Sequence, residues 1–218
     1  MIKRREFLQG SVILGCVVVV GRTLLARAAG PTTLTGAELM SRMTWLNDPA
    51  SATKDGDQLV VRSRAKTDFW RQTTTGTIMD NGHFFHLSVS SAFVFQARVN
   101  GQFAAEFDQA GLMVRLNPEN WMKCGTELFA GHRRASVVFT REFSDWSTML
   151  DLSEAAPVWW RVIRKHNSIQ VLYSLDGKDF TFVRDGYFEP EVKVDVGILC
   201  AAPTGPGFEA VFDHLQLE

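Results

Sequence analysis

Apolar and polar residues alternate in short runs along most of the chain, and this alternation predicts β-strands. Successive side chains of a strand point to opposite faces, so the alternation marks a strand with one buried face. Roughly a dozen runs follow one another at intervals of about 8 to 15 residues, separated by Gly, Asn, Asp and Pro. The clearest runs occupy residues 58–63, 84–88, 93–99, 110–116, 121–129, 135–141, 159–164, 168–174, 180–184, 192–200 and 208–217.

A helical pattern is confined to the start of this region. Leu34, Leu39 and Met40 are the apolar positions of a short helix predicted over residues 33–43. Parallel strands need crossover segments between them, usually helices. Because the remaining sequence shows no helical periodicity, the strands should pair in antiparallel fashion. About a dozen antiparallel strands in about 190 residues predict one all-β sandwich or closed barrel.

Residues typical of tight turns separate several of these strands. Asn100-Gly101 is a strong hairpin signal, and Asp176-Gly177 predicts a second hairpin. The segment 117–120 predicts a third turn, which would pair the strands on either side of it.

The start of the chain reads as an export signal and not as part of the fold. Arg4 and Arg5 are followed by one residue of any type and then by two apolar residues, which matches the twin-arginine export pattern. A weakly apolar stretch follows at residues 10–21, and small residues around Ala28 place signal cleavage after that position.

Two alternatives compete with export. A membrane anchor needs about 20 apolar residues, more than this run provides, so we expect no stable membrane insertion after signal removal. A lipoprotein would use Cys16, which lies in the middle of the apolar run. The sequence thus predicts a signal at residues 1–28, a short leader or helix at 29–42 and a β-sandwich domain at 43–218, located in the periplasm or secreted.

The charge balance argues against nucleic acid as a partner. The 218 residues include 23 Lys and Arg against 24 Asp and Glu, for a formal net charge of −1. Binding to phosphates needs a clustered surplus of basic side chains.

After signal removal the chain keeps two cysteines. Cys124 and Cys200 either pair in an oxidising compartment or remain buried thiols. The sequence contains no Cys-x-x-Cys motif and no Cys/His cluster, so we expect no metal and no cofactor.

The richest chemistry lies in the strand predicted at residues 121–129. Alternation puts Trp121, Lys123 and Glu127 on one face, with Gly125 leaving a gap between the two charges. An aromatic ring can stack on the apolar face of a sugar, and charged groups can hydrogen-bond to its hydroxyls. The alternative is a solvated face with a Lys–Glu pair of little energetic weight.

Two neighbouring segments add side chains to this face. Gln109 and Arg115 share one face of the preceding strand, and a hairpin through residues 117–120 would bring them near the charged pair. Trp146, in a loop predicted at residues 144–147, offers another ring; alternatively it closes the end of the sandwich.

Carboxylates suggest a second kind of function. Glu106 and Asp108 are predicted on one strand face, as in the first part of the Glu-x-Asp-x-Glu motif of jelly-roll glucanases. Retaining hydrolysis needs a nucleophile and an acid/base about 5–5.5 Å apart. The third carboxylate is missing at residues 110–111; Glu127, on the adjacent strand, is the candidate to replace it, but nothing in the sequence places it there.

Five short segments carry a resemblance to a known family. They are FDQAGLMVRL at residues 107–116, NWMKCGTE at 120–127, FSDWS at 143–147, WRV at 160–162 and YSLDG at 173–177. In this order they resemble a domain-of-unknown-function family, widespread in bacteria and fungi, that includes the fungal regulation of enolase protein. The resemblance extends over residues 43–218. It implies a concanavalin A-like fold, a two-sheet antiparallel jelly roll shared by lectins, carbohydrate-binding modules and glycosidases, and it implies no settled activity.

The leading hypothesis is an exported binding module that recognises a carbohydrate or a similar polyhydroxylated ligand on a concave sheet. The ligand-binding residues it predicts are Gln109, Arg115, Trp121, Lys123, Glu127 and Trp146. A glycan-active hydrolase or lyase and a protein-interaction domain are the alternatives.

Overall fold

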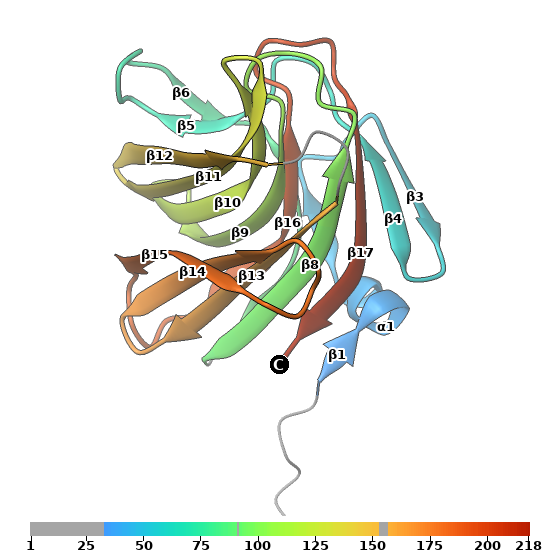
Figure 1. Cartoon of the computed structure of the whole chain (residues 1–218). Helices are drawn as coiled ribbons and strands as arrows, with labels where there is room; N and C mark the ends of the chain where they lie inside the picture. Colours follow the sequence, from blue (N-terminus) through green and yellow to red (C-terminus); the bar gives the residue numbers. More distant parts are fainter. Residues whose placement is uncertain (1–32, 91, 153–156) are drawn as a thin grey trace, which may run out of the picture. The chain divides into compact units, whose positions relative to one another are not determined.

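Two antiparallel β-sheets pack face to face in the computed structural model of the chain (Figure 1). The structure describes residues 33–90, 92–152 and 157–218. The export signal predicted at residues 1–28, and residues 29–32 of the predicted leader, lie outside these described residues. Within the described part of the chain, no helix has the length and apolar character needed to cross a membrane.

The first sheet has eight strands. Seven of them run from edge to edge in the order β15 (Thr181–Tyr187), β14 (Ser168–Ser174), β13 (Val158–Lys165), β8 (Phe93–Gly101), β17 (Glu209–Leu217), β4 (Gln58–Arg62) and β3 (Ser51–Asp55), and β1 (Leu34–Thr35) also pairs with β17. The short helix α1 (Gly36–Ser41) follows β1 and lies against β17 (Figure 1). It falls within the predicted helical segment.

The second sheet has seven strands. Their order is β12 (Phe143–Asp151), β11 (His132–Arg141), β10 (Asn120–Phe129), β9 (Gln109–Asn117), β16 (Val194–Ala201), β7 (His83–Val89) and β2 (Thr44–Leu46). Neighbouring strands of this sheet pair in antiparallel fashion. The predicted two-sheet antiparallel jelly roll of the concanavalin A-like type is therefore confirmed.

Strand alternation supplies the core between the sheets. Along β8, Phe95, Ala97 and Val99 are buried on the inner face, while the residues that alternate with them are more exposed. Trp160 on β13 is fully buried, and its Nε1 donates a hydrogen bond to Thr126 Oγ1 of the opposite sheet at 3.4 Å. Each large apolar side chain removed from water contributes about 1.5–3 kcal/mol, so this inner layer holds the sheets together.

The two cysteines on the inner faces are free thiols. Cys124 lies on β10 and Cys200 on β16, both buried in the core between the sheets. Of the two alternatives drawn from the sequence, the structure supports buried thiols. Burial raises the pKa of both thiols well above the ordinary range.

Two of the three predicted turns join paired strands. Residues 117–120 connect β9 to β10, and Asp176-Gly177 lies between β14 and β15. The hairpin predicted at Asn100-Gly101 is wrong. Strand β8 continues through Gly101, pairs with β13 and β17, and the chain then crosses into the other sheet to form β9. The dipeptide is paired within the sheet, and the connection needs the longer segment that follows.

Glycines mark a close approach of two strands in the seven-stranded sheet. Gly111 and Gly125 lie directly opposite each other on β9 and β10. A Cβ atom added to Gly125 would lie 2.2 Å from the carbonyl oxygen of Ala110, and one added to Gly111 would lie 1.9 Å from that of Cys124. Because the obstructing atoms belong to the backbone, the two strands tolerate glycine alone at this point.

Gly125→Ala should therefore destabilise the domain by about 1–3 kcal/mol, the usual cost of overpacking. Urea denaturation of the purified protein measures the change. Thr53→Ala, on the exposed strand β3, is the control and should alter the free energy of unfolding by less than about 0.5 kcal/mol. Unchanged stability of Gly125→Ala would mean that the strands separate without cost.

Candidate functional site

A short β-hairpin covers part of the outer face of the seven-stranded sheet. It consists of β5 (Phe69–Arg71) and β6 (Ile78–Asp80), which pair with each other as a separate two-stranded sheet. Figure 1 shows the hairpin on the side of this sheet that faces away from the eight-stranded sheet. A second apolar cluster fills the space beneath it, formed by Phe69, Phe84, Met113, Trp121, Val138 and Leu199.

Polar contacts fix the hairpin at its base. The Arg115 guanidinium on β9 donates hydrogen bonds to both carboxylate oxygens of Asp80, at 2.7 and 2.8 Å. The Asn47 side-chain amide donates to the carbonyl oxygens of Asp80 and Gly82, both at 2.9 Å. A bidentate Arg–carboxylate pair is geometrically specific, so it sets the position of the hairpin on the sheet.

A second set of contacts fixes the hairpin toward its tip. The backbone N–H of Arg71 donates to Ser144 Oγ of β12 at 2.9 Å, and Arg71 Nε donates to the carbonyl oxygen of Glu142 at 3.0 Å. The hairpin is thus attached to both the centre and the edge of the sheet, and it forms a wall above the outer face.

A pocket of about 290 Å³ lies between this wall and the sheet. Its lining combines aromatic and polar side chains and is formed by Asp68, Trp70, Thr74, Thr75, Thr77, Met79, Phe107, Gln109, Lys123, Glu127, Val138, Trp146 and Pro203. The volume is at the small end of the ~300–1,000 Å³ typical of ligand sites.

The polar floor is organised around one ammonium group. Lys123 Nζ donates to Asp68 Oδ1 at 2.9 Å and to the carbonyl oxygen of Phe69 at 2.7 Å. Gln109 Nε2 also donates to Asp68 Oδ1, at 3.3 Å. Lys123 is 5% exposed, and a charge this deeply buried is tolerated when it is paired and hydrogen-bonded.

Glu127 lies on the same face of β10 as Lys123 and is also buried. Its Oε2 accepts a hydrogen bond from Trp146 Nε1 at 3.0 Å, and the same indole N–H lies 3.0 Å from Ser136 Oγ. Burial raises the pKa of the Glu127 carboxyl above its usual range, while nearby Lys123 and the hydrogen bonds from Ser136 and Trp146 act in the opposite direction. The pocket therefore holds a carboxyl group that binds its proton more tightly than a solvated glutamate does.

Three aromatic side chains line the pocket. The ring of Trp146 packs edge-on against Phe129, with centroids 4.9 Å apart, and against Phe107 at 6.2 Å. Trp70 comes from the hairpin, and its Nε1 donates to the carbonyl oxygen of Thr73 at 3.0 Å. The indole rings of the hairpin and of β12 are thus both held in place by hydrogen bonds, which preserves the shape of the pocket.

Phe107 occupies an unusual backbone conformation. Its φ angle is 68°, in the left-handed region that a bulky side chain rarely adopts. Its N–H donates to the carbonyl oxygen of Leu128 at 2.7 Å, and its carbonyl accepts from Gln109 Nε2 at 3.2 Å. Strained residues that surrounding contacts hold in place are common at binding sites, and this one places an aromatic ring at the pocket.

The structure brings together four of the six residues predicted to bind a ligand. Gln109, Lys123, Glu127 and Trp146 line the same pocket, and the register places Gln109 directly opposite Glu127. Trp146 lies on strand β12, whereas the sequence predicted a loop there.

The other two predicted residues lie beneath the hairpin. Trp121 is 1% exposed, packs edge-on against Phe69 and donates its Nε1 hydrogen bond to the carbonyl oxygen of Pro118. Arg115 is occupied by its ion pair with Asp80, and its guanidinium lies over the Phe69 ring. The predicted shared face is correct, and the hairpin covers the end of it that carries these two side chains.

Sequence reasoning missed the side chains that the hairpin segment supplies. Asp68 directly precedes a strand of three residues, Trp70 belongs to that strand, and the threonines at 74, 75 and 77 belong to the hairpin loop. A strand this short shows no alternation. The remaining signal was a tryptophan and an aspartate beside a threonine-rich turn, which is not specific to a binding site.

The carboxylates considered for hydrolysis lie elsewhere. Glu106 and Asp108 are in the connection before β9, not on a strand, because the backbone turns at Phe107. Asp108 Oδ2 accepts hydrogen bonds from the N–H groups of Ala104 and Ala105, at 3.0 and 2.9 Å. Neither carboxylate lines the pocket. Among the described residues, no group of three or more His, Cys, Asp and Glu side chains is arranged to hold a metal ion.

The fold and the pocket together define a concanavalin A-like sandwich with a partly covered site on the outer face of one sheet. Residues 45–218 match a family described as "Protein of unknown function (DUF1349)". The chain is 35% identical over 178 residues to Regulation of enolase protein 1 of Saccharomyces cerevisiae, a match that covers 82% of this chain and 90% of that protein. The chain therefore belongs to the DUF1349 family.

Solved structures agree with this assignment. A functionally unknown protein from Saccharomyces cerevisiae superposes with a TM-score of 0.79 at 35% identity, covering 82% of this chain and 97% of that chain. The carbohydrate-binding module CBM66 from Bacillus subtilis superposes with a TM-score of 0.55 at 12% identity, covering 81% of this chain and 95% of that one. At this low identity the second similarity shows the shared fold alone.

The raised pKa of Glu127 predicts a pH-dependent stability. A carboxyl group whose pKa is higher in the folded state stabilises the fold fully below its ordinary pKa of 4.5, and this contribution is lost as pH rises through the higher, folded-state value. Glu127→Gln, which cannot ionise and still accepts the Trp146 hydrogen bond, should unfold at a higher temperature than wild type near pH 8. Thermal unfolding should show the difference shrinking toward zero near pH 4.

Glu38→Gln, on the exposed surface of α1, is the control and should leave the pH profile unchanged. A Glu127→Gln profile parallel to that of wild type across this range would contradict a raised pKa.

Proposed function

We propose that this protein is a carbohydrate-binding module that holds a short saccharide in the pocket beneath the β5–β6 hairpin. The observation that carries the proposal is the composition of the pocket, in which the rings of Trp70 and Trp146 accompany the hydrogen-bonding side chains of Asp68, Lys123 and Gln109. A sugar ring has an apolar face and a rim of hydroxyl groups, and both find complementary groups here.

The polar floor is suited to hydroxyl groups. Lys123 supplies donors, the Asp68 carboxylate supplies acceptors and the Gln109 amide supplies both. These groups are already ordered by contacts with one another, so little conformational entropy is lost when a ligand binds. The small volume favours a monosaccharide or disaccharide over a long polymer chain.

The shape of the site favours a small ligand over a protein partner. A protein-interaction domain would present a flat apolar patch, whereas this pocket lies between a raised hairpin and the sheet. The shared fold with the CBM66 module is compatible with the proposal, but the residues of the pocket carry it.

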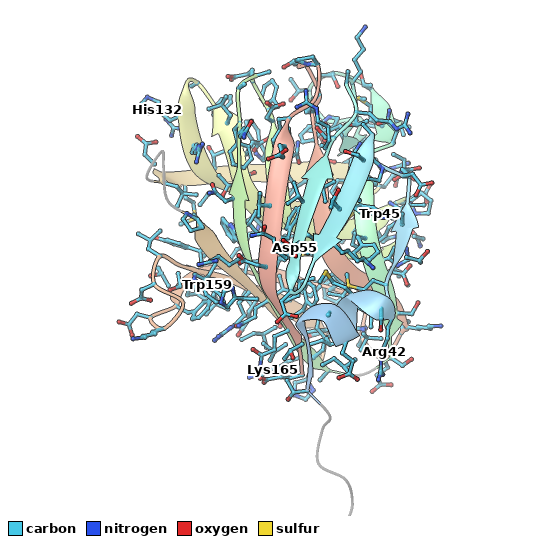
Figure 2. All side chains as sticks on the ribbon, turned by 90° about the vertical axis from the view of Figure 1, so that its right-hand side faces the viewer. Arg42, Trp45, Asp55, His132, Trp159 and Lys165 are labelled. Carbon is cyan, nitrogen blue, oxygen red and sulfur yellow. The ribbon has the colours of Figure 1, made fainter. Side chains whose placement is uncertain are left out.

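Trp70→Ala should abolish saccharide binding, because it removes one of the stacking surfaces; Trp70 is only partly buried, at the margin of the second apolar cluster. A glycan array followed by titration calorimetry with the best sugar tests this. Trp159→Ala is the matched control, since Trp159 lies on β13 of the eight-stranded sheet (Figure 2) and does not line the pocket, so its loss should leave the affinity unchanged.

The result that would overturn the proposal is equal affinity of wild type and Trp70→Ala for every sugar that binds. A broad array without any binding to the folded wild-type protein would also overturn it.

A glycan-active hydrolase is the second candidate function. Glu127 has a raised pKa, as a general acid requires, and Asp68 lies in the same pocket as a second carboxylate. If the protein is an enzyme, Glu127→Gln should keep affinity for the sugar identified above and lose turnover of it. If it is a binding module, the wild-type protein should bind that sugar and release it unchanged.

We also propose that the protein acts outside the cytoplasm. The twin-arginine pattern at Arg4 and Arg5 supports this location. Fractionation of cells that express the full chain, with Arg4 and Arg5 replaced by Lys as the comparison, tests it.

A further inference from the structure

An arginine is buried at one end of the sandwich. Arg164 is on β13, on the same face as the core residues Trp160 and Val162, and its side chain therefore points toward the opposite sheet. It is 3% exposed. The next residue, Lys165, is labelled in Figure 2 and marks this end of the molecule.

The guanidinium of Arg164 is incompletely paired. Its Nη2 donates a hydrogen bond to the carbonyl oxygen of Glu189 at 3.0 Å. Its Nη1 is buried and has no partner among the described residues, and no carboxylate of the described part of the chain forms an ion pair with it. Burial lowers the pKa of Arg164, but an arginine stays protonated in proteins. A buried cation with an unused donor is costly unless an anion or water compensates it.

A pocket of about 280 Å³ adjoins this arginine. Three connections converge on it: Ser90 and Ala92 come from the β7–β8 connection, His166 and Asn167 from the β13–β14 turn, and Pro190 and Glu191 from the β15–β16 connection. The serine hydroxyl, the asparagine amide and the histidine ring can each donate a hydrogen bond. The pocket thus combines a buried positive charge with neutral side chains that can donate hydrogen bonds.

We propose that this pocket binds an oxyanion, the carboxylate or phosphate group of a small ligand, with the guanidinium of Arg164 as the central donor. The site is independent of the saccharide pocket, because the two share no lining residue among those that the structure describes. Arginine is the side chain best suited to such groups, since its N–H donors form charge-assisted hydrogen bonds to anionic oxygens.

One acidic side chain opposes the proposed ligand. Glu191 lines the pocket but is exposed to solvent, so water and salt screen its charge. Arg164 is buried and its field is screened far less. The balance favours an anion near Arg164, and it predicts opposite effects for substitutions of these two residues.

Titration calorimetry of inorganic phosphate, acetate and glucuronate into the purified full chain, at constant ionic strength set with chloride, tests the proposal. We expect at least one of these anions to bind, and Arg164→Met to weaken its affinity by at least about tenfold. Glu191→Gln should strengthen the affinity by roughly twofold. Binding of phosphate alone would identify a phosphate ligand, and binding of acetate and glucuronate a carboxylate.

Arg161→Met is the matched control, because Arg161 is on the other face of the same strand, where it contacts Gln96 and the Phe180 ring. It should leave anion affinity unchanged. If Arg164→Met fails to fold, Asn167→Ala and His166→Ala replace it, since both side chains are exposed. Absence of binding for all three anions, or binding that survives these substitutions unchanged, would overturn the proposal.

Discussion

One buried ammonium group links the hairpin to the sheet. Lys123 rises from β10, near the centre of the seven-stranded sheet, and contacts both Asp68 and the backbone of Phe69 where the hairpin begins. A buried lysine needs partners of this kind, and the partly buried Asp68 carboxylate is stabilised by the same contact. The ion pair between Lys123 and Asp68 holds the hairpin above the sheet, and this separation forms the pocket. The Arg115–Asp80 pair then fixes the other strand of the hairpin over the same face.

Local alternation was enough to predict the fold class and much of the site. Along β9 and β10, core residues alternate with residues of the outer face. The face shared by Lys123, Glu127 and Gln109 could therefore be predicted from this alternation and from the turn that joins the two strands. The prediction of this shared face succeeded because successive side chains of a strand point to opposite faces of the sheet. The antiparallel order followed from the lack of helices that could join parallel strands.

The features that sequence reasoning missed depend on contacts between distant segments. The hairpin carries only three residues in each strand, and nothing local indicates that it covers Trp121 and contacts Arg115. Asn100-Gly101 has the composition of a tight turn, but pairing with β17 extends β8 through it. Here tertiary pairing overrides local preference, and a local pattern cannot report such pairing.

The two buried thiols give the protein a built-in reporter of its own motion. Thiol reagents react with the thiolate, and Cys124 and Cys200 are both shielded by the sandwich and hard to ionise. Either position therefore reacts only while the structure around it is open. The rate at which these two cysteines are labelled therefore reports how often the native protein opens around them, and no probe has to be engineered.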